Sequence, residues 1–220
     1  MLQMLQTMDW GLIDYEEALT KQLELVEQVA AQNLRGILVF CTHPAVVTLG
    51  RATQPGDVFA WDGPVKEISR GGRATYHGPS QLVIYPILNL NISSQNLPAK
   101  DIGAYLRIFE SCIVKTLKEF GVESQGRSLQ KKSEEEIAAE ETGVWVGRKK
   151  IASLGIAVKK WVAYHGAAIN VSEDAKAFKG MNPCGFSSDV MTSLEAQTKT
   201  PVSQAQFQNS IKSHLLTALS

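Results

Sequence analysis

Two residues in the C-terminal half of the chain, Cys184 and Lys150, could together form a nucleophilic site. Cys184 lies between Pro183 and Gly185, so a proline fixes the approach to it and a glycine allows a sharp bend after it. A free thiol has a pKa of roughly 8.5 and becomes an effective nucleophile beside a base or a cation. Lys150 begins an apolar run and could supply that cation, although this placement is also typical of the solvent-exposed end of a strand.

Two histidines are alternative activators of this thiol. His77 and His165 each follow a tyrosine and precede a glycine, and either could equally have a structural role. A papain-like Cys-His-Asn site stays open on residue types alone, although the local cysteine signature of that class is absent. Cys41 and Cys112 lie in an apolar strand pattern and on a helix face, which favours the role of small buried hydrophobic residues.

A glycine-rich loop is predicted at residues 70–81, between apolar strand patterns at 65–68 and 82–90. Glycine loses much conformational freedom on folding, and such a loop usually lets the backbone approach a ligand closely. A tight hairpin between the two strands is the simpler alternative, but a hairpin needs only two or three special residues. The loop matches neither of the common phosphate-binding glycine patterns. The 4 histidines are scattered, so no metal site is predicted.

Composition excludes several classes of function. The chain has 220 residues with 22 basic and 22 acidic side chains, so its charge gives no case for binding nucleic acid or an anionic membrane. The 3 cysteines include no C-x-x-C pair, which favours a reducing compartment over a disulfide framework. We find no signal-peptide pattern and no long apolar run, so a cytoplasmic protein is expected.

Apolar periodicity predicts the elements that must position these residues. Helices are expected at residues 14–33, with Asp14 as the cap, and at 99–120 and 202–218. Strands are expected at 36–41, 45–49, 65–68 and 82–90, and an antiparallel meander at 144–146, 151–158 and 161–171. The acidic stretch 134–141 is predicted to be a solvated surface. Strands grouped with helices indicate an α+β (mixed α/β) fold, in one domain over residues 1–220.

Four motifs, in order, resemble those of the lipoyl(octanoyl) transferases of lipoate biosynthesis. They are residues 43–51 (HPAVVTLGR), the loop 70–81 (RGGRATYHGPSQ), residues 147–156 (GRKKIASLGI) with 165–171 (HGAAINV), and residues 182–185 (NPCG) with 192–194 (TSL). The resemblance covers most of residues 36–195. One departure is Ser80, where the family usually has glycine.

This resemblance implies the catalytic-domain fold of lipoate and biotin protein ligases and a cysteine–lysine acyltransferase. Cys184 would carry the acyl thioester, Lys150 would favour its thiolate form, and backbone N–H groups near Cys184 would stabilise the oxyanion. His165 and Arg51 would support the site, and His77 is expected to position the substrate. The residues expected to line the acyl group are Arg70, Gly71, Gly72, Arg73, Ala74, Thr75, Tyr76, His77, Ser153, Leu154, Gly155, Gly166, Ala167 and Ala168.

The resemblance also implies the partners. The donor would be octanoyl-acyl carrier protein, and the acceptors would be lipoyl domains of 2-oxo acid dehydrogenases and the glycine cleavage H protein. These are small acidic domains, so Arg51, Arg70, Arg73 and Arg148 are candidate contacts. A monomer is expected, with no cofactor, because transfer from thioester to amide runs downhill. Two alternatives stay open: an ATP-dependent lipoate ligase of the same fold, and a non-catalytic module that binds acyl carrier protein.

Overall fold

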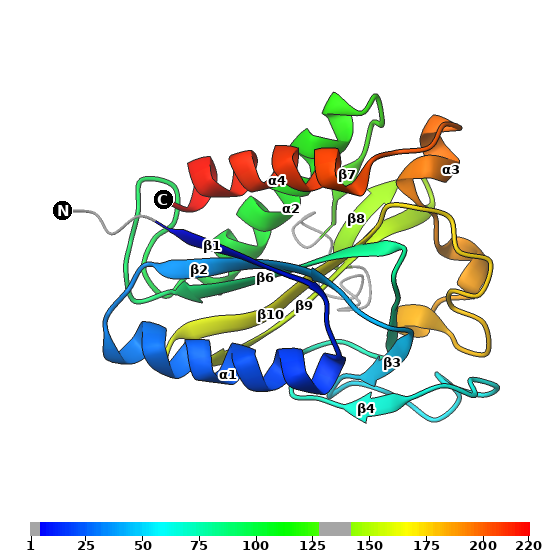
Figure 1. Ribbon diagram of the computed structural model, residues 1–220, viewed down its shortest axis with the longest axis horizontal. Helices are drawn as coiled ribbons and strands as arrows, with labels where there is room; N and C mark the ends of the chain where they lie inside the picture. The colour runs from blue at the N-terminus through cyan, green and yellow to red at the C-terminus, as the bar shows by residue number, and fades with distance from the viewer. Residues whose placement is uncertain (1–4, 128–141) are drawn as a thin grey trace, which may run out of the picture.

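The computed structural model describes residues 5–127 and 142–220, and within them the strands form two sheets. The larger sheet is the middle layer of the molecule (Figure 1), with seven strands in the order β1-β2-β6-β10-β9-β8-β7. Its strands are β1 (Gln6–Leu12), β2 (Gly36–Thr42), β6 (Gln81–Asn89), β7 (Gln125–Gly126), β8 (Gly143–Val146), β9 (Lys149–Lys159) and β10 (Val162–Asn170). β1 is parallel to β2, and the other neighbours are antiparallel. The predicted α+β class is therefore confirmed.

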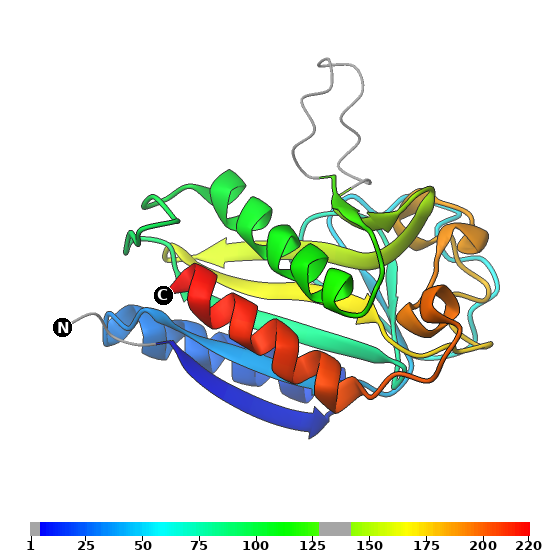
Figure 2. The same cartoon turned by 90° about the horizontal axis from the view of Figure 1, so that it is seen from above.

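Helices cover both faces of this sheet (Figures 1 and 2). α1 (Tyr15–Ala31) packs on one face against β6 and β10, and α2 (Ile102–Glu119) lies beside α4 (Gln204–Leu219) on the other. Each face has its own hydrophobic core, in which Val26 of α1 and Phe109 of α2 are fully buried. Burial of one such side chain stabilises the fold by about 1.5–3 kcal/mol, so these two cores hold the three layers together.

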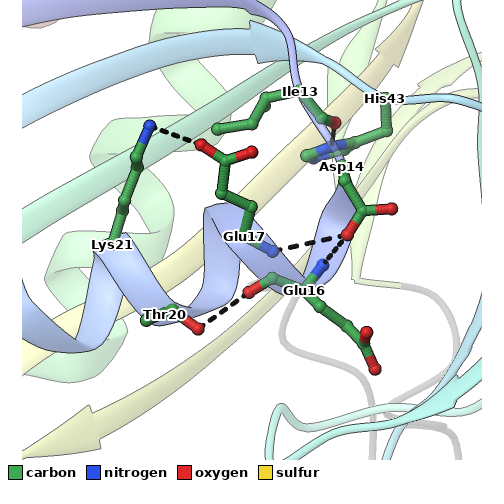
Figure 3. Close-up of polar contacts among 7 residues, drawn as sticks. All are labelled: Ile13, Asp14, Glu16, Glu17, Thr20, Lys21 and His43. Atoms are coloured by element: carbon green, nitrogen blue, oxygen red, sulfur yellow. Dashed lines mark hydrogen bonds and ion pairs between the residues drawn. The ribbon is translucent and has the colours of Figure 1, made fainter.

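The start of α1 is fixed by a cap and by a histidine (Figure 3). The Asp14 carboxylate accepts the backbone N–H groups of Glu16 at 2.8 Å and Glu17 at 3.4 Å, which confirms the predicted cap. Both glutamates also suit the positive end of the helix. The Nδ1 atom of His43 lies 2.8 Å from the carbonyl oxygen of Ile13. The turn after β2 is therefore joined to Ile13, the residue before the helix cap Asp14.

A smaller sheet carries the glycine-rich loop. It has the order β4 (Val65–Glu67), β3 (Val46–Leu49) and β5 (Thr75–His77), and β3 and β4 lie near the N-terminal end of α1 (Figure 1). β5 forms within the predicted loop 70–81 and pairs antiparallel with β3. The hairpin alternative is wrong, because β4 and β6 belong to different sheets. The glycine-rich segment crosses from one sheet to the other.

The other predicted elements are confirmed with small shifts at their ends, and the antiparallel meander is formed by β8, β9 and β10. β1 was not predicted, because its side chains are mostly exposed and form no apolar run. The short helix α3 (Leu194–Thr198) was also not predicted. The acidic stretch 134–141 lies outside the described residues. Among the described helices, none has the length and apolar character needed to cross a membrane.

Candidate active site

Cys184 lies at the bend of a short 3-10 turn (η2, Pro183–Gly185) with its side chain partly exposed. Its φ of 54° and ψ of 25° are in the left-handed region, which costs a non-glycine residue about 1 kcal/mol or more. Its backbone N–H donates to the carbonyl of Ala74 at 2.8 Å, which fixes the turn against β5. Cys41 and Cys112 are buried, as predicted, and burial raises the pKa of the Cys112 thiol to about 11. Of these three described cysteines, Cys184 is the accessible one.

Lys150 is buried, with a relative exposure of 1%. The alternative that it marks the solvent-exposed end of a strand is therefore wrong. Its carbonyl accepts the N–H of Thr192 at 3.0 Å, and its ammonium lies 5.6 Å from the ring centre of Trp145 and 5.9 Å from that of Phe186. Both distances suit cation–π contacts. Full burial of a lysine is uncommon, and this observation singles out Lys150 among the lysines that the structure describes.

One cavity joins these two residues. Its empty volume is about 530 Å³, a figure that includes space open to solvent. The sheet, the glycine-rich loop, α1 and the Cys184 turn all contribute to it. Its lining residues are Tyr15, Arg70, Gly72, Arg73, Thr75, His77, Val83, Tyr85, Thr142, Lys150, Ser153, Leu154, Gly155, His165, Gly166, Ala167, Ala168 and Cys184. Most of the predicted site residues are thus brought together.

The remaining predicted site residues lie elsewhere: Gly71, Ala74, Tyr76 and Arg51. Successive side chains of a strand point to opposite faces. Thr75 and His77 therefore face the cavity, while Ala74 and Tyr76 pack in a small separate core. Gly71 instead ties the loop to β9, because its N–H donates to the carbonyl of Ile156 at 3.1 Å.

Sequence reasoning missed some of the lining residues, namely Tyr15, Val83, Tyr85 and Thr142. Tyr15 is at the start of a helix and Tyr85 is in a fully buried strand, and neither position has a local sequence signal for ligand contact. Tyr15 and Tyr85 reach the same cavity because α1 packs across β6 and β10.

Arg70 gives the glycine-rich loop its shape. It is 7% exposed, and its guanidinium donates to the carbonyls of Thr48 at 2.9 Å, Gly71 at 2.9 Å and Arg73 at 2.8 Å. A Cβ atom at Gly155 would lie 3.0 Å from Arg70 Cδ, so this glycine lets the loop pack closely on β9. The expectation that Arg70 contacts an acidic partner is wrong, because its guanidinium is turned inward and donates to backbone carbonyls there.

Arg73 forms a mostly buried ion pair with Asp57. Its Nε donates to Asp57 Oδ2 at 3.0 Å and its Nη2 to Asp57 Oδ1, and Asp57 is 1% exposed. The Asp57 carbonyl accepts the N–H of Asn182 at 2.8 Å, so the ion pair supports the segment that leads into Cys184. Arg73 is thus also engaged internally. Of the basic residues proposed for an acidic partner, Arg51 and Arg148 are the exposed ones.

The described histidines do not contact the Cys184 thiol. The polar neighbour recorded for its sulfur is the Ser153 hydroxyl at 3.9 Å, so a papain-like Cys-His arrangement is wrong. Burial, assisted by the charge of Arg70, lowers the pKa of His165 to about 3, and burial also lowers the pKa of His77 well below its usual value. Both rings are neutral at neutral pH. Among the described residues, no group of three or more His, Cys, Asp or Glu side chains could hold a metal ion.

The backbone N–H groups of the Cys184 turn already donate hydrogen bonds within the protein. Those of Cys184, Gly185 and Phe186 each donate to a carbonyl, at 2.8, 3.0 and 3.0 Å. The expectation that they form an oxyanion hole is therefore wrong for this conformation. The Ser153 hydroxyl, 3.9 Å from the Cys184 sulfur, is a side-chain donor on the lining of the same cavity.

A chain of polar contacts joins three of the motifs behind the cavity. The Gln81 amide donates to Asn170 Oδ1 at 2.9 Å, and the Asn170 amide donates to the carbonyl of Thr192 at 2.8 Å. Thr192 in turn donates its N–H to Lys150. These hydrogen bonds position Lys150 at the start of β9.

Solved structures first define the class of this fold. The chain superposes on a Thermoplasma acidophilum protein of the lipoate protein ligase type with bound lipoic acid, at a TM-score of 0.69, 18% identity and coverage of 100% of this chain and 86% of that chain. Biotin protein ligase from Aquifex aeolicus, in complex with biotin and ATP, gives a TM-score of 0.55 at 13% identity, over 97% and 70% of the two chains. The expected ligase-like catalytic fold is confirmed.

The sequence then defines the family. Residues 14–216 match the family model described as the lipoyl protein ligase A/B catalytic domain, and the chain belongs to this family. An octanoyltransferase of Bdellovibrio bacteriovorus is 57% identical over 96% of this chain and 97% of its own length. An octanoyltransferase of Syntrophotalea carbinolica is 36% identical over 96% and 92%. The resemblance inferred from the four motifs is confirmed.

Proposed function

We propose that this protein is an octanoyltransferase, which moves an octanoyl group from a carrier thioester to the ε-amine of a lysine through a thioester on Cys184. The observation that carries the proposal is the placement of a partly exposed thiol and a buried lysine on the wall of one cavity. Relatives named octanoyltransferase, matched over nearly their whole length, support the same reaction class.

In the first step the Cys184 thiolate attacks the carbonyl carbon of the octanoyl thioester. A new carbon–sulfur bond forms, the bond to the carrier sulfur breaks, and the carrier thiolate takes up a proton as it leaves. The Lys150 ammonium favours the Cys184 thiolate by its charge and supplies that proton. The Ser153 hydroxyl and the Lys150 ammonium stabilise the oxyanion of the tetrahedral intermediate.

In the second step the neutral amine of an acceptor lysine attacks the acyl-enzyme. The amide bond forms, the bond to Cys184 breaks, and the amine loses a proton that Lys150, now neutral, accepts. The site thus returns to a thiolate and an ammonium. The overall change converts a thioester into an amide, which runs downhill and needs no ATP.

The apolar part of the cavity holds the acyl chain. Leu154, Val83, Ala167 and Ala168 contribute aliphatic wall, and Gly155 and Gly166 present backbone. An octanoyl chain has about six methylenes, each worth about 0.8 kcal/mol when buried, so the chain contributes about 5 kcal/mol to binding. This energy holds the carbonyl carbon beside Cys184 during both steps.

Acyl-carrier and lipoyl-domain proteins are the general class of partner for this family. We further propose octanoyl-acyl carrier protein as donor, and lipoyl domains of 2-oxo acid dehydrogenases and the glycine cleavage H protein as acceptors. The exposed Arg51 and Arg148 are available to such acidic domains. The proposed enzyme acts in the cytoplasm as a monomer and as a single catalytic domain.

Intact-protein mass spectrometry after incubation with octanoyl-acyl carrier protein tests the proposal. We expect one octanoyl adduct, localised to Cys184 by peptide mapping and discharged by an apo lipoyl domain. Cys184→Ser should lose the adduct and most of the transfer activity. Cys112→Ala, which alters a buried cysteine that is not on the lining of the cavity, is the matched control and should keep the adduct.

Two results would contradict the proposal. Transfer by Cys184→Ser that depends on ATP and free octanoate would indicate a ligase. An unmodified wild-type protein that still binds the acylated carrier would indicate a non-catalytic module.

A further inference from the structure

Lys150 lies opposite Trp145 at an irregular point of the β8–β9 ladder, where the register shifts by one residue. Val144 pairs with Ala152, whereas the next residue of β8, Trp145, pairs with Lys150. One additional residue of β9, Ile151, therefore lies between the two pairs. Such a β-bulge changes the direction of the side chains beside it and is common next to active sites.

The bulge brings Lys150 to the cavity. Lys150 and Ser153 are three residues apart in β9, so in a regular strand their side chains would point to opposite faces of the sheet. Both residues nevertheless line the same cavity. The additional residue between them accounts for this arrangement, because it shifts the alternation of the strand by one step.

Two aromatic rings contact the Lys150 ammonium at this position. Its nitrogen lies 5.6 Å from the ring centre of Trp145 and 5.9 Å from that of Phe186. The two rings meet edge to face, with their centres 5.4 Å apart and an angle of 84° between their planes. Trp145 is 3% exposed, so its attraction to the cation acts largely out of contact with water, where such contacts are strongest.

The two rings belong to different parts of the fold. Trp145 is in β8, and its ring centre lies 4.1 Å from the guanidinium of Arg127, which also donates to the carbonyl of Gly147 at 2.9 Å. Phe186 is the cap residue that follows the turn carrying Cys184. The contact between the rings therefore joins the strand pair that holds the lysine to the turn that holds the nucleophile.

The backbone of β8 also approaches Lys150 closely. A Cβ atom at Gly143 would lie 2.8 Å from Lys150 Cε and 2.3 Å from the carbonyl oxygen of Ala152. The Gly143 N–H donates to Glu110 Oε1 at 2.9 Å, which fixes this end of the strand. Glycine at this position leaves the space that the lysine side chain occupies.

Aromatic rings suit a lysine that changes its charge during a reaction. In the proposed cycle Lys150 gives up a proton in the first step and takes one back in the second. The face of an aromatic ring attracts an ammonium, but the ring carries no net charge. Loss of the proton therefore leaves no unpaired charge on these two partners, whereas a buried carboxylate partner would be left uncompensated.

We propose that Trp145 and Phe186 are positioning residues that hold the Lys150 ammonium beside the Cys184 turn, an inference that rests on the proposed function. Within the described part of the chain, neither ring lines the cavity, so both act on the reaction through Lys150. Weakening this contact should slow acyl transfer and leave binding of the donor unchanged.

Graded fluorination of the Trp145 ring tests the proposal, because fluorine withdraws negative charge from the face of an indole and barely changes its shape. Tryptophan with one, two or three fluorine atoms is incorporated at position 145, and acylation of Cys184 by octanoyl-acyl carrier protein is followed. We expect the rate at saturating donor to fall stepwise, by about tenfold in total, with KM changed by less than about twofold.

Trp161 provides the matched control. Its ring centre lies 5.3 Å from the Lys100 ammonium, and it does not line the cavity. Trifluorotryptophan at position 161 weakens a contact of the same kind and should leave the acylation rate unchanged. Equal acylation rates with the fluorinated ring at positions 145 and 161 would overturn the inference and leave the proposed function standing.

Phe186 repeats the test from the second ring, and it carries the test if the fluorinated protein fails to fold, as judged by circular dichroism and thermal unfolding. Phe186→Leu should slow acylation by about tenfold, because it removes the ring. Phe186→Tyr keeps the ring and should stay within about threefold of the wild-type rate. Equal rates in these two variants would overturn the inference.

A variant without the lysine separates positioning of Lys150 from packing. In otherwise wild-type protein, trifluorotryptophan at position 145 should slow alkylation of Cys184 by iodoacetamide by about threefold or more. In Lys150→Met the same fluorination should have no effect, because the cation is gone. An effect that persists in Lys150→Met would overturn the inference. A wild-type protein that takes up no acyl group would overturn the proposed function, and the inference with it.

Discussion

The hydroxyl oxygen of Ser153 lies 3.9 Å from the sulfur of Cys184, on the floor of the cavity formed by β9 and β10. The nearest backbone N–H groups, those of the Cys184 turn, are already donated to carbonyls. We therefore propose that side chains beside the thiol, Ser153 among them, supply the donors for a negative oxygen. This relationship places the electrostatic part of the proposed catalysis on the sheet.

Ser153→Ala is expected to slow acylation of Cys184 by octanoyl-acyl carrier protein about 100-fold, the typical cost of removing one oxyanion donor. KM should change little, because the donor acts mainly on the tetrahedral intermediate. Single-turnover acylation measures the effect. Alkylation of Cys184 by iodoacetamide forms no oxyanion and should keep its rate. An equal loss in both reactions would indicate that Ser153 acts on the thiol instead.

Lys150→Met is expected to move the pH profile of Cys184 alkylation to higher pH. The methionine fills a similar volume but removes the positive charge that favours the thiolate. The measurement is the rate of iodoacetamide alkylation against pH, followed by mass spectrometry. Lys149→Met makes the same chemical change at the exposed neighbouring residue and should leave the profile unchanged. A wild-type profile in Lys150→Met would exclude Lys150 as the activator.

Asp57→Asn is expected to lower the free energy of unfolding at pH 7 by about 3 kcal/mol, because it leaves Arg73 largely buried without its countercharge. Burial raises the pKa of Asp57, but the Arg73 hydrogen bond and charge outweigh burial, so the net pKa lies below its usual value of 3.8. The contribution is therefore complete above pH 3.8 and is lost only as the pH falls through the lower folded value. Urea unfolding measures it.

The same variant should also slow acylation, because loss of the ion pair with Arg73 loosens the segment whose backbone carbonyl accepts the Asn182 N–H ahead of Cys184. Arg73→Met alone should destabilise the protein too. The double variant should lose less stability than the sum of the two single losses, because they remove one interaction. Strict additivity would mean that the ion pair contributes nothing of its own.

The buried histidines are expected to make the protein sensitive to mild acid. The pKa of His165 is lowered from 6.5 to about 3, so the unfolded chain binds a proton that the folded protein does not. Stability is full above pH 6.5 and falls as the pH decreases toward 3, by about 2 kcal/mol for His165 at pH 5. His77 acts in the same direction.

His165→Asn should remove the part of the acid-induced loss of stability that comes from His165. Asparagine tolerates the left-handed backbone at this position. Urea unfolding at pH 7.5 and pH 5 compares the two proteins. An equal loss of stability in both would show that His165 is not the group that titrates.

The sequence determined the elements and the candidate nucleophile. Apolar periodicity located α1, α2, α4 and the main strands, because a helix or strand that buries one face must repeat apolar residues at its own period. Proline and glycine around Cys184 indicated an exposed bend, and four ordered motifs indicated the family. These features are local, so the order of residues along the chain is sufficient to reveal them.

Tertiary structure decided the rest. A lysine at the start of a strand can be exposed or buried, and only the packing of the Cys184 segment over β9 buries Lys150. The partners of the N–H groups at the Cys184 turn, the inward direction of Arg70, and the presence of Tyr15 and His165 on one cavity lining all depend on contacts between segments far apart in the sequence. Each of these features depends on how the helices and sheets pack against one another, and no local sequence pattern determines that packing.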